Sequence, residues 1–411
     1  MEVLYPRCAG LDVHEAFIMV CRRVQHADGP VEKVVRRYST MTADLLALAD
    51  WLADAGVTHV AMESTGVFWK PVWNLLEGRF TLLLVNPRDV KQVPGRQTDV
   101  ADAAWLAQLL QYGLLKGSLV PPPPIRVLRD LTRHRTTLIR DKTRVINRIH
   151  KVLEDANIKL TAVASDIMGV SGRAMLAALV RGDTDPAQLA ALAQRRLRRK
   201  RPQLEQALQG RVQPHHRLLL QSLLAQVTFL EQEVTAIEGV IETTLRPFAA
   251  PLQLLKTIPG IKARAANVLA ELGPDMRVFP TAAHCASWAA LCPGHDETGG
   301  KRRSGKTRHG NRWLKGTLTE AAWVASRTNG TYAAAQYRRL AGRRGKKRAI
   351  VAVAHSLLIA AYHVLRDGVA YHDLGPQHFD RLNETHLTRH LVKRLEHLGH
   401  KVTLEPAHVA A

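Results

Sequence analysis

Short apolar runs dominate the first part of the chain, and their spacing predicts strands. Apolar and polar positions alternate over residues 4–24, which indicates a β-hairpin with one strand ending at Val13 and a second over Ala16–Cys21. Residues 31–38 continue this alternation and are expected to extend the same sheet.

Helical spacing then begins to alternate with strand-like runs. Residues 43–55 have apolar side chains at helical intervals, with Thr42 as the expected N-cap, and a second helix is expected near residues 70–76. His59–Glu63 and Phe80–Val85 have the composition of buried strands. Three strands followed by alternating helices and strands predict a mixed α/β layer fold for this part.

Longer helical patterns follow a run of prolines. Residues 121–124 are all proline and are expected to form a stiff linker that ends the first domain. Long helices are predicted over 125–157 and about 215–246. We therefore predict an α/β domain over 1–120, a helical coiled-coil region over 121–250, a mainly helical domain over 251–372 and a tail over 373–411.

The composition favours a polyanionic partner. The 411 residues include 58 Lys and Arg against 36 Asp and Glu, a formal charge of +22. Contacts with phosphates would make binding strongly salt-dependent. A membrane is the weaker interpretation, because no apolar run is expected to approach the length of about 20 residues that spans a bilayer, and the N-terminus has no signal-peptide pattern. The cysteines, which lack C-x-x-C pairs, indicate reduced thiols in a cytoplasm.

Four carboxylates occur where a metal-dependent nuclease would need them: Asp12, Glu63, Asp99 and Asp102. The first lies inside a predicted strand and the second ends another. The last two are three residues apart at the start of a predicted helix and therefore share one helix face. Acidic residues in a first helical turn, with Thr98 as N-cap, are also favoured for stability alone. A carboxylate within an apolar strand is harder to explain in that way, because burying it unpaired is costly.

Two segments, one basic and one glycine-containing, can be interpreted either as ordinary structure or as nucleic-acid contacts. The run Arg195–Arg201 is either a solvated surface or a nucleic-acid contact, as are the arginines of the predicted helix 125–157. The segment Leu254–Ile261 followed by the helical residues 265–272 is typical of a helix-hairpin-helix, in which a Pro-Gly turn presents amides to a phosphate. An ordinary helix turn is the alternative.

The segment 300–307 fits the pattern G-x-x-x-x-G-K-T, but its flanks do not fit a P-loop. A P-loop follows a buried strand and opens a helix, whereas polar residues lie on both sides here. A loop whose amides and cations hold nucleic-acid phosphates is the better interpretation. His284, Cys285, Cys292 and His295 match no common zinc finger, and the two cysteines are expected in the core.

Several motifs together resemble the DEDD transposases of bridge-RNA-guided insertion sequences. In the first 120 residues they are Asp12-Val-His14, Glu63-Ser-Thr-Gly-Val-Phe-Trp-Lys-Pro-Val72, Val85-Asn-Pro87 and Thr98-Asp-Val-Ala-Asp-Ala103. In the C-terminal half they are Ile258-Pro-Gly-Ile261, Ala286-Ser-Trp-Ala289, Leu291-Cys-Pro-Gly294, Lys301-Arg-Arg-Ser-Gly305 and Gly310-Asn-Arg-Trp-Leu314. The resemblance implies a RuvC-like (ribonuclease-H-like) N-terminal domain, whose four acidic residues bind Mg²⁺, and a C-terminal transposase domain.

The resemblance also implies a hydroxyl nucleophile in the glycine-rich segment. The family's serine, which becomes covalently joined to a DNA end, corresponds to Thr298, after Glu297. Threonine is a departure, since its extra methyl group crowds in-line attack and stiffens χ1. Ser304 is the alternative nucleophile.

The sequence thus predicts an RNA-guided DNA transposase or recombinase that cleaves and rejoins strands at element ends and target. Its expected partners are DNA, a guide (bridge) RNA and further copies of the chain, in a bacterial cytoplasm at the nucleoid and without a membrane. A RuvC-type nuclease that uses water as the nucleophile is one alternative. A non-catalytic nucleic-acid-binding protein is another.

Overall fold

The computed structural model describes residues 2–26, 29–64, 66–87, 98–294, 297–302, 305–382 and 384–405. The chain divides into two compact units, Met1–Pro121 and Pro122–Ala411, each with its own core. The finer division of the second unit into a coiled-coil region, a transposase domain and a tail remains a prediction.

The N-terminal unit is built on a mixed sheet. Its strands are β1 (Arg7–Val13), β2 (Phe17–Val24), β3 (Glu32–Ser39), β4 (His59–Glu63) and β5 (Thr81–Val85), in the order β3-β2-β1-β4-β5. Within the first three strands the pairing is antiparallel, and β4 runs parallel to both β1 and β5. The mixed α/β fold class predicted for this part is confirmed.

Helices cover both faces of this sheet. On one face, α1 (Thr42–Asp54) and α2 (Trp69–Leu76) pack on a core that includes Leu11 of β1 and Val60 of β4. On the other face lies α4 (Asp99–Gln111), which packs on Cys8 and Ala61 through its buried leucines. Strand alternation therefore sends even-numbered β1 residues towards α4 and odd-numbered ones towards α1.

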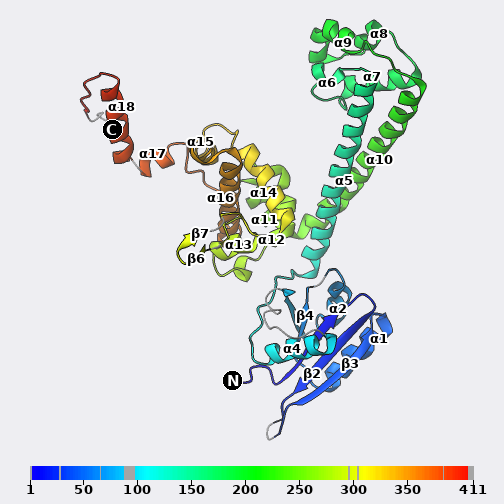
Figure 1. The fold of residues 1–411 in the computed structure, drawn as a ribbon, viewed down its shortest axis with the longest axis vertical. Coiled ribbons are helices and arrows are strands. Elements are labelled where there is room, and N and C mark those ends of the chain that lie inside the picture. The colour runs from blue at the N-terminus through cyan, green and yellow to red at the C-terminus, as the bar shows by residue number, and fades with distance from the viewer. Residues whose placement is uncertain are drawn as a thin grey trace. The chain divides into compact units, whose positions relative to one another are not determined.

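Two long helices lie side by side in the second unit (Figure 1). They are α5 (Pro123–Asp155) and α10 (Pro214–Leu245), of 33 and 32 residues, so each is about 50 Å long at 1.5 Å per residue. The segment between them folds into a small helical tip with α6 (Leu160–Val163), α7 (Val170–Arg181), α8 (Pro186–Ala191), η1 (Arg195–Lys200) and α9 (Arg201–Ala207). The tip packs on the neighbouring ends of both long helices, where Leu153 and Leu220 are buried.

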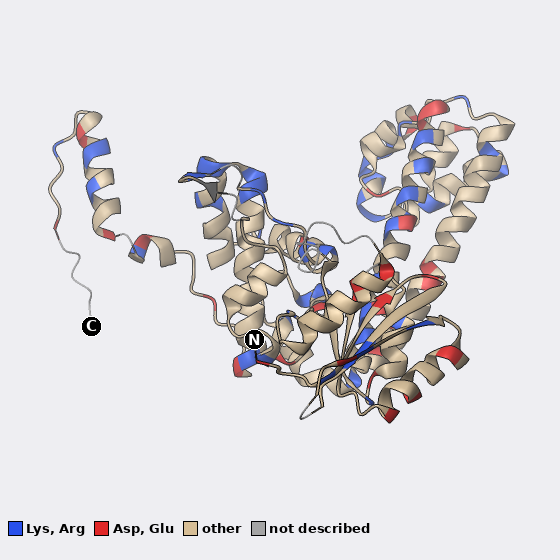
Figure 2. Cartoon of the chain, turned by 60° about the horizontal axis from the view of Figure 1, so that its bottom comes forward, with Lys and Arg blue, Asp and Glu red and all other residues tan. Residues whose placement is uncertain are grey.

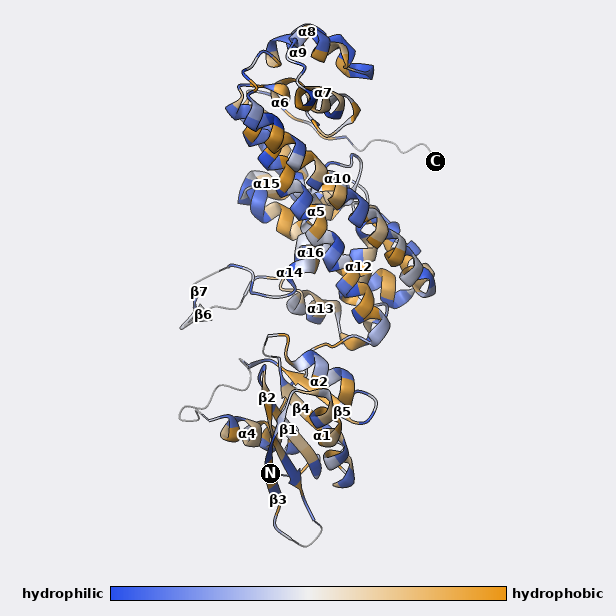
Figure 3. Cartoon of the chain, turned by 90° about the vertical axis from the view of Figure 1, so that its right-hand side faces the viewer, coloured by the Kyte–Doolittle hydropathy of each residue, from blue (hydrophilic) through white to orange (hydrophobic). Residues whose placement is uncertain are grey.

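The rest of the second unit is mainly helical, as predicted. It contains η2 (Arg246–Phe248), α11 (Ala249–Lys256), η3 (Lys262–Arg264), α12 (Ala265–Leu272), η4 (Met276–Val278), α13 (Ala282–Trp288), α14 (Arg312–Ala325), α15 (Tyr332–Arg344), α16 (Lys346–Asp367), α17 (His378–Leu382) and α18 (Glu384–His397). A short hairpin, β6 (Glu297–Thr298) and β7 (Lys301–Arg302), projects from these helices (Figure 3). Helix α16 is central, and its buried Tyr362 donates a hydrogen bond to the carbonyl of Phe279 at 3.1 Å.

Two sequence predictions about helices were wrong. Thr42 is not the N-cap of α1, because Met41 holds the extended capping position and Thr42 is the first helical residue. Helix α16 is, by length and composition, apolar enough to cross a membrane, contrary to the expectation that no such run exists. Half of its apolar stretch is buried within the unit, where Ala354 and Leu358 are fully covered, as in the core helix of a globular domain.

The predicted helix-hairpin-helix has a helix on each side of its turn, α11 and α12. Gly260 has a φ of +80°, and a Cβ at this position would lie 2.2 Å from the carbonyl oxygen of Ala321 on α14. The turn thus requires glycine both for its backbone conformation and for its close packing. Phosphate binding by this turn remains a prediction.

Candidate metal centre and nucleophile loop

Asp12 lies near the end of β1 on the face covered by α4. Its side chain is only 14% exposed, and its Oδ2 accepts a hydrogen bond from Nε2 of His14 at 3.0 Å. Burial raises the pKa of Asp12, with smaller contributions from the charges of Asp99 and Asp102, whereas His14 acts in the opposite direction. The strand thus holds a carboxylate close to other negative charge, where a cation would be stabilised.

Glu63 reaches the same edge and the same face of the sheet. Strand β4 is parallel to β1 with Leu11 opposite Met62, so the next residues, Asp12 and Glu63, lie at the same level. Ala61, two residues earlier, packs towards α4, and strand alternation gives Glu63 the same direction. One carboxylate oxygen of Glu63 is shielded from solvent. Two strand ends therefore bring two carboxylates to one place.

Asp99 and Asp102 come from the first turn of α4. Thr98 caps this helix as predicted, accepting a hydrogen bond from the amide of Ala101 at 3.3 Å. Oδ1 of Asp99 lies 3.6 Å from Nε2 of His14, and the ligand atoms of Asp12, His14 and Asp99 all lie within 4.8 Å of one another. Asp102 is more exposed, but its charge contributes to the pKa of Asp12.

Gly10 allows α4 to approach the sheet. A Cβ on this residue would lie 2.4 Å from the amide nitrogen of Ala107 and 2.5 Å from the carbonyl oxygen of Ala103. The thiol of Cys8, two residues earlier, also lies 3.5 Å from the carbonyl oxygen of Ala107. The helix backbone therefore rests directly on β1, and this contact fixes Asp99 next to Asp12.

His14 is a site residue whose role the sequence did not predict. Its ring stacks on Phe17 with a centroid distance of 4.6 Å, and its Nε2 lies between two carboxylates. The signal was the spacing Asp-x-His at a strand end, which places the two side chains on the same face. The sequence motif Asp12-Val-His14 predicts a role for the aspartate only.

Thr298 lies on a hairpin in the other unit. The pairs Glu297 with Arg302 and Thr298 with Lys301 form β6 and β7, and Gly299 and Gly300 connect them with φ of +57° and +72°. Two successive residues with positive φ are typical of a tight type I′ hairpin turn. Gly300 therefore lies in a hairpin turn, whereas in a P-loop it would follow a buried strand. This turn agrees with the interpretation of the segment as a loop of another kind. Ser304 and His295 lie outside the described residues.

The base of this loop is closed by backbone contacts. Pro293 forms a β-bridge with Thr307, and the amide of Gly294 donates to the carbonyl of Lys306 at 2.9 Å. Lys315 of α14 donates to Oγ1 of Thr307 at 2.5 Å. Residues 293–307, which carry the predicted nucleophile and have the hairpin as their outer part, are called the nucleophile loop below. The two ends of the loop are thus joined to each other, and the Thr307 end is attached to α14.

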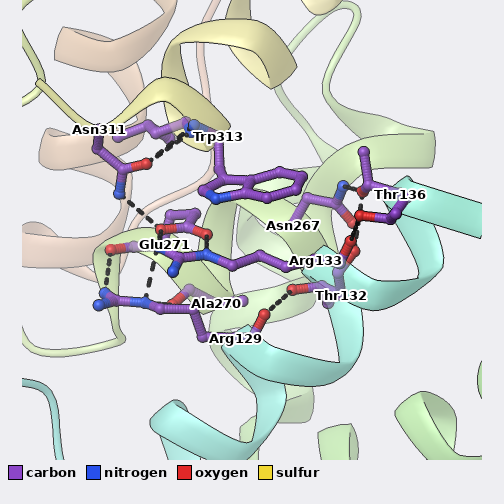
Figure 4. A network of polar contacts seen from close by, with 11 residues as sticks. Arg129, Thr132, Arg133, Thr136, Asn267, Ala270, Glu271, Asn311 and Trp313 are labelled. Carbon is purple, nitrogen blue, oxygen red and sulfur yellow. Dashed lines mark hydrogen bonds and ion pairs between the residues drawn. The ribbon is translucent and has the colours of Figure 1, made fainter. Parts of the chain in front are cut away.

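A buried polar network fixes the segment that follows the loop (Figure 4). The side chain of Glu271 on α12 is 3% exposed and accepts two hydrogen bonds from Arg133 of α5, at 2.7 and 2.8 Å. It also accepts one from Nδ2 of Asn311 at 2.6 Å. Oδ1 of Asn311 in turn caps α14 by accepting from the amides of Trp313 and Leu314, both at 3.1 Å.

Arginines complete this network. Arg129 donates to the carbonyls of Ala270 and Glu271 at 3.1 and 2.8 Å, which satisfies the end of α12. Arg133 and Arg140 of α5 lie 5.7 and 5.1 Å from the ring centre of Trp313, within cation–π range. Helices α5, α12 and α14 are therefore joined at one point, next to the nucleophile loop.

Family models of transposases match two parts of the chain. Residues 9–158 match a family model of DEDD transposases of the IS110 type, and residues 252–338 match the model of the IS116/IS110/IS902 transposase family. An uncharacterised 43.6 kDa protein of insertion element IS110 from Streptomyces coelicolor is 31% identical over 163 residues. That match covers 39% of this chain and 39% of the relative. A RuvC structure from Thermus thermophilus is 13% identical, with a TM-score of 0.21, over 27% of this chain and 99% of that one.

Both family models describe transposases, and they match separate parts of the chain in the order in which the carboxylates and the nucleophile loop occur. The chain belongs to the IS110 family of DEDD transposases.

Proposed function

We propose that this chain is a DNA transposase, or recombinase, that cleaves and rejoins DNA strands at the ends of a mobile element and at its target. The proximity of Asp12 to Asp99, on a strand and a helix that Gly10 brings together, is the observation that carries this proposal. Family membership gives the reaction class, and the formal charge of +22 suits a nucleic-acid partner.

The four carboxylates fit a divalent cation. They offer hard oxygen ligands on rigid elements, which Mg²⁺ prefers, and the clustered charge that raises the pKa of Asp12 would be relieved by a bound cation. Asp12, Glu63, Asp99 and Asp102 would hold Mg²⁺, and His14 would orient Asp12 through its hydrogen bond. When bound, the ion supplies Lewis-acid polarisation of a scissile phosphate.

The hydroxyl of Thr298 is the proposed nucleophile. Its oxygen loses its proton and forms a bond to the phosphorus of a DNA phosphodiester, while the bond from phosphorus to one ester oxygen breaks; that oxygen leaves with the electron pair and takes up a proton. The DNA end thereby becomes joined to the protein, and a later attack by a DNA hydroxyl reverses the step on another strand. Ser304 is the alternative nucleophile, six residues further along the chain.

The remaining partners follow from the family resemblance. A guide RNA would select the target by base pairing, as other RNA-guided proteins do. The carboxylates belong to the N-terminal unit and Thr298 to the second unit, so a composite site between copies in a dimer or tetramer is consistent with this division. The chain would act in the cytoplasm, at the nucleoid.

A labelled-DNA assay tests the proposal. With Mg²⁺ and its guide RNA, the unchanged chain should form a protein–DNA adduct that survives denaturing electrophoresis. Free cut ends without an adduct would instead indicate a nuclease that uses water. Binding without cleavage would indicate a nucleic-acid-binding protein whose carboxylates are structural.

Asp99→Asn tests the metal centre. It should abolish Mg²⁺-dependent cleavage and leave the thermal midpoint unchanged or raised, because like-charge repulsion is relieved. Asp44→Asn is the matched control, since Asp44 is also an aspartate in a first helical turn, that of α1 on the opposite face of the sheet. Full activity of Asp99→Asn would remove Asp99 from the centre.

Substitutions in the loop test the nucleophile. Thr298→Ala should lose the adduct but keep DNA binding, whereas Thr298→Ser should retain the adduct and form it faster, since the methyl group is gone. Loss of the adduct in Ser304→Ala, but not in Thr298→Ala, would reassign the nucleophile to Ser304.

A further inference from the structure

A cavity of about 1170 Å³ lies at the base of the nucleophile loop. One wall is the loop itself, through Pro293 and residues 305–307, and the opposite wall is formed by the end of α15 and the first turns of α16. Ligand cavities for small molecules typically have about 300–1,000 Å³, so this cavity has room for more than a single phosphate ion.

The rim of this cavity is strongly basic. Arg344, Lys347 and Arg348 line it from the α15–α16 turn, and Lys306 lines it from the loop. Among the residues that the structure describes, none of those lining the cavity is acidic, and the sequence from Tyr332 to Arg366 contains no Asp or Glu. Positive charge gathered around a concave surface attracts polyanions, and Lys and Arg are prominent on this unit (Figure 2).

The floor of the cavity differs from its rim. Leu291, Val351 and Ala352 make it largely apolar. Polar groups lie among them, because Nε2 of Gln336 donates to Oγ of Ser356 at 2.8 Å. Oε1 of Gln336 is buried and accepts no hydrogen bond within the described part of the chain. An apolar floor with a few polar groups and a cationic rim matches a nucleotide, whose base is flat and apolar on its faces and whose phosphates are charged.

The position of the cavity relates it to the reaction. The bridge between Pro293 and Thr307 and the hydrogen bond from Gly294 to Lys306 close the neck of the loop. Residues of this neck line the cavity, and Thr298 follows Pro293 by five positions on the same loop. A strand held here would therefore be bound by the segment that carries the proposed nucleophile.

We propose that this cavity binds an unpaired nucleotide of the DNA strand next to the bond that is cut, with its phosphates on Arg344, Lys347 and Arg348 and its base on the apolar floor. A duplex could contact the rim but could not place a base on the floor. The assignment to the cut strand rests on the proposed function, whereas the binding of an unpaired nucleotide does not.

The first test compares two variants of equal charge by fluorescence anisotropy in EDTA, with a fluorescein-labelled single-stranded oligodeoxynucleotide. The variant R344A/K347A/R348A removes three cations of the rim. R338A/R343A/K346A removes three exposed cations of the same segment that do not line the cavity. Each phosphate contact adds about 0.7 to the slope of log affinity against log salt for single strands, so the first variant should lower this slope by about 2. The second should change it much less.

The second test fills the floor without changing charge. Ala352→Trp should weaken binding of the single strand at least tenfold and leave binding of a duplex of the same sequence nearly unchanged. Circular dichroism and the thermal midpoint check that the variant is folded, and the rim variants test the cavity independently if it is not. An Ala352→Trp protein that folds and binds the single strand normally would overturn the proposal.

Two further results would overturn the proposal. One is an equal slope of log affinity against log salt for the rim and control variants. The other is a loss of affinity in the rim variant for an oligoribonucleotide of the same sequence but not for the oligodeoxynucleotide, because the cavity would then be an RNA site. The proposed function fails separately, since it requires an adduct from the unchanged chain with Mg²⁺. If that adduct forms and the rim variant forms it as fast as the control variant, the cavity does not hold the cut strand.

Discussion

Gly10→Ala tests whether the contact between α4 and β1 positions the metal centre. The added Cβ would lie 2.4 Å from the amide nitrogen of Ala107, whereas ordinary contact begins near 3.4 Å. Both close atoms belong to the backbone of α4, so no side chain can rotate away. The helix must therefore retreat from the strand by about 1 Å, and Asp99 moves with it.

The expected cost in stability is moderate and the expected cost in activity is large. Overpacking of this kind costs ~1–3 kcal/mol, and the reduced flexibility of the unfolded chain offsets about 0.4–1 kcal/mol of it. A domain with a total stability of about 5–15 kcal/mol stays folded after such a loss. A displacement of about 1 Å in a catalytic group can lower the rate ~100-fold. We expect Mg²⁺-dependent cleavage to fall by one to two orders of magnitude, about 10- to 100-fold.

Urea unfolding measures the first quantity and the labelled-DNA assay measures the second. Gly117→Ala is the control within the same unit, because the nearest atom to its added Cβ is Cγ of Leu83 at 3.9 Å. Gly10→Ala with the stability and the cleavage rate of Gly117→Ala would refute the argument that this contact sets the position of Asp99.

Four other predictions concern the second unit. Glu271→Ala should lower the free energy of unfolding by ~3–5 kcal/mol, because it leaves buried arginine charge unpaired. The control Asp50→Ala breaks an exposed pair with an arginine at 2.7 Å and should cost less than ~1 kcal/mol. Equal losses of the two variants in urea unfolding would contradict a stabilising role of the Glu271 network. Neutralising the four arginines within the run 195–199 of the tip, which has no buried residue in η1, should flatten the salt dependence of nucleic-acid affinity, and an unchanged slope would identify a solvated surface. Burial raises the pKa of Cys285 to about 12 from 9.0, so this thiol should resist Ellman's reagent at pH 8, where the half-buried Cys292 should react first. Because the folded-state pKa of Cys285 is the higher one, its contribution to stability should be constant below pH 9 and decline as the pH rises towards 12; a rise in stability over that range would contradict it.

Local periodicity sufficed to predict most elements of the fold. The strand His59–Glu63 has the predicted bounds, and α4 begins at Asp99 with Thr98 as its cap. These elements are specified by alternation, apolar spacing and a capping side chain, all of which are visible in a short window of sequence. The cap of α1 was misassigned because Thr42 has the preferred side chain, whereas Thr42 is already the first helical residue and Met41 occupies the cap position without a side-chain hydrogen bond.

The sequence was less informative about contacts between distant elements. The role of Gly10 depends on Ala103 and Ala107, which approach it only because α4 crosses β1. His14 became part of the site through Asp99, 85 positions further along the chain. Glu271 looked like an ordinary helix residue because its partners Arg133 and Asn311 lie far away in sequence. A single sequence contains no signal that pairs such residues.

The network around Glu271 also connects the two regions of the chain that match the family models, and this limits where the chain can be divided. The C-terminal family model covers residues 252–338, which leaves out Arg133, the partner of Glu271 and 138 residues away in the chain. Arg133 is synthesised before Glu271, with the whole tip and α10 between them, and stays solvated until Glu271 has been made. The contact between the two residues therefore closes a long loop, and we expect it to form late in folding. A fragment that starts at residue 252 would bury a carboxylate without its arginines. For that reason a transfer of the C-terminal domain between members of the family should succeed only when the first turns of α5 are transferred with it.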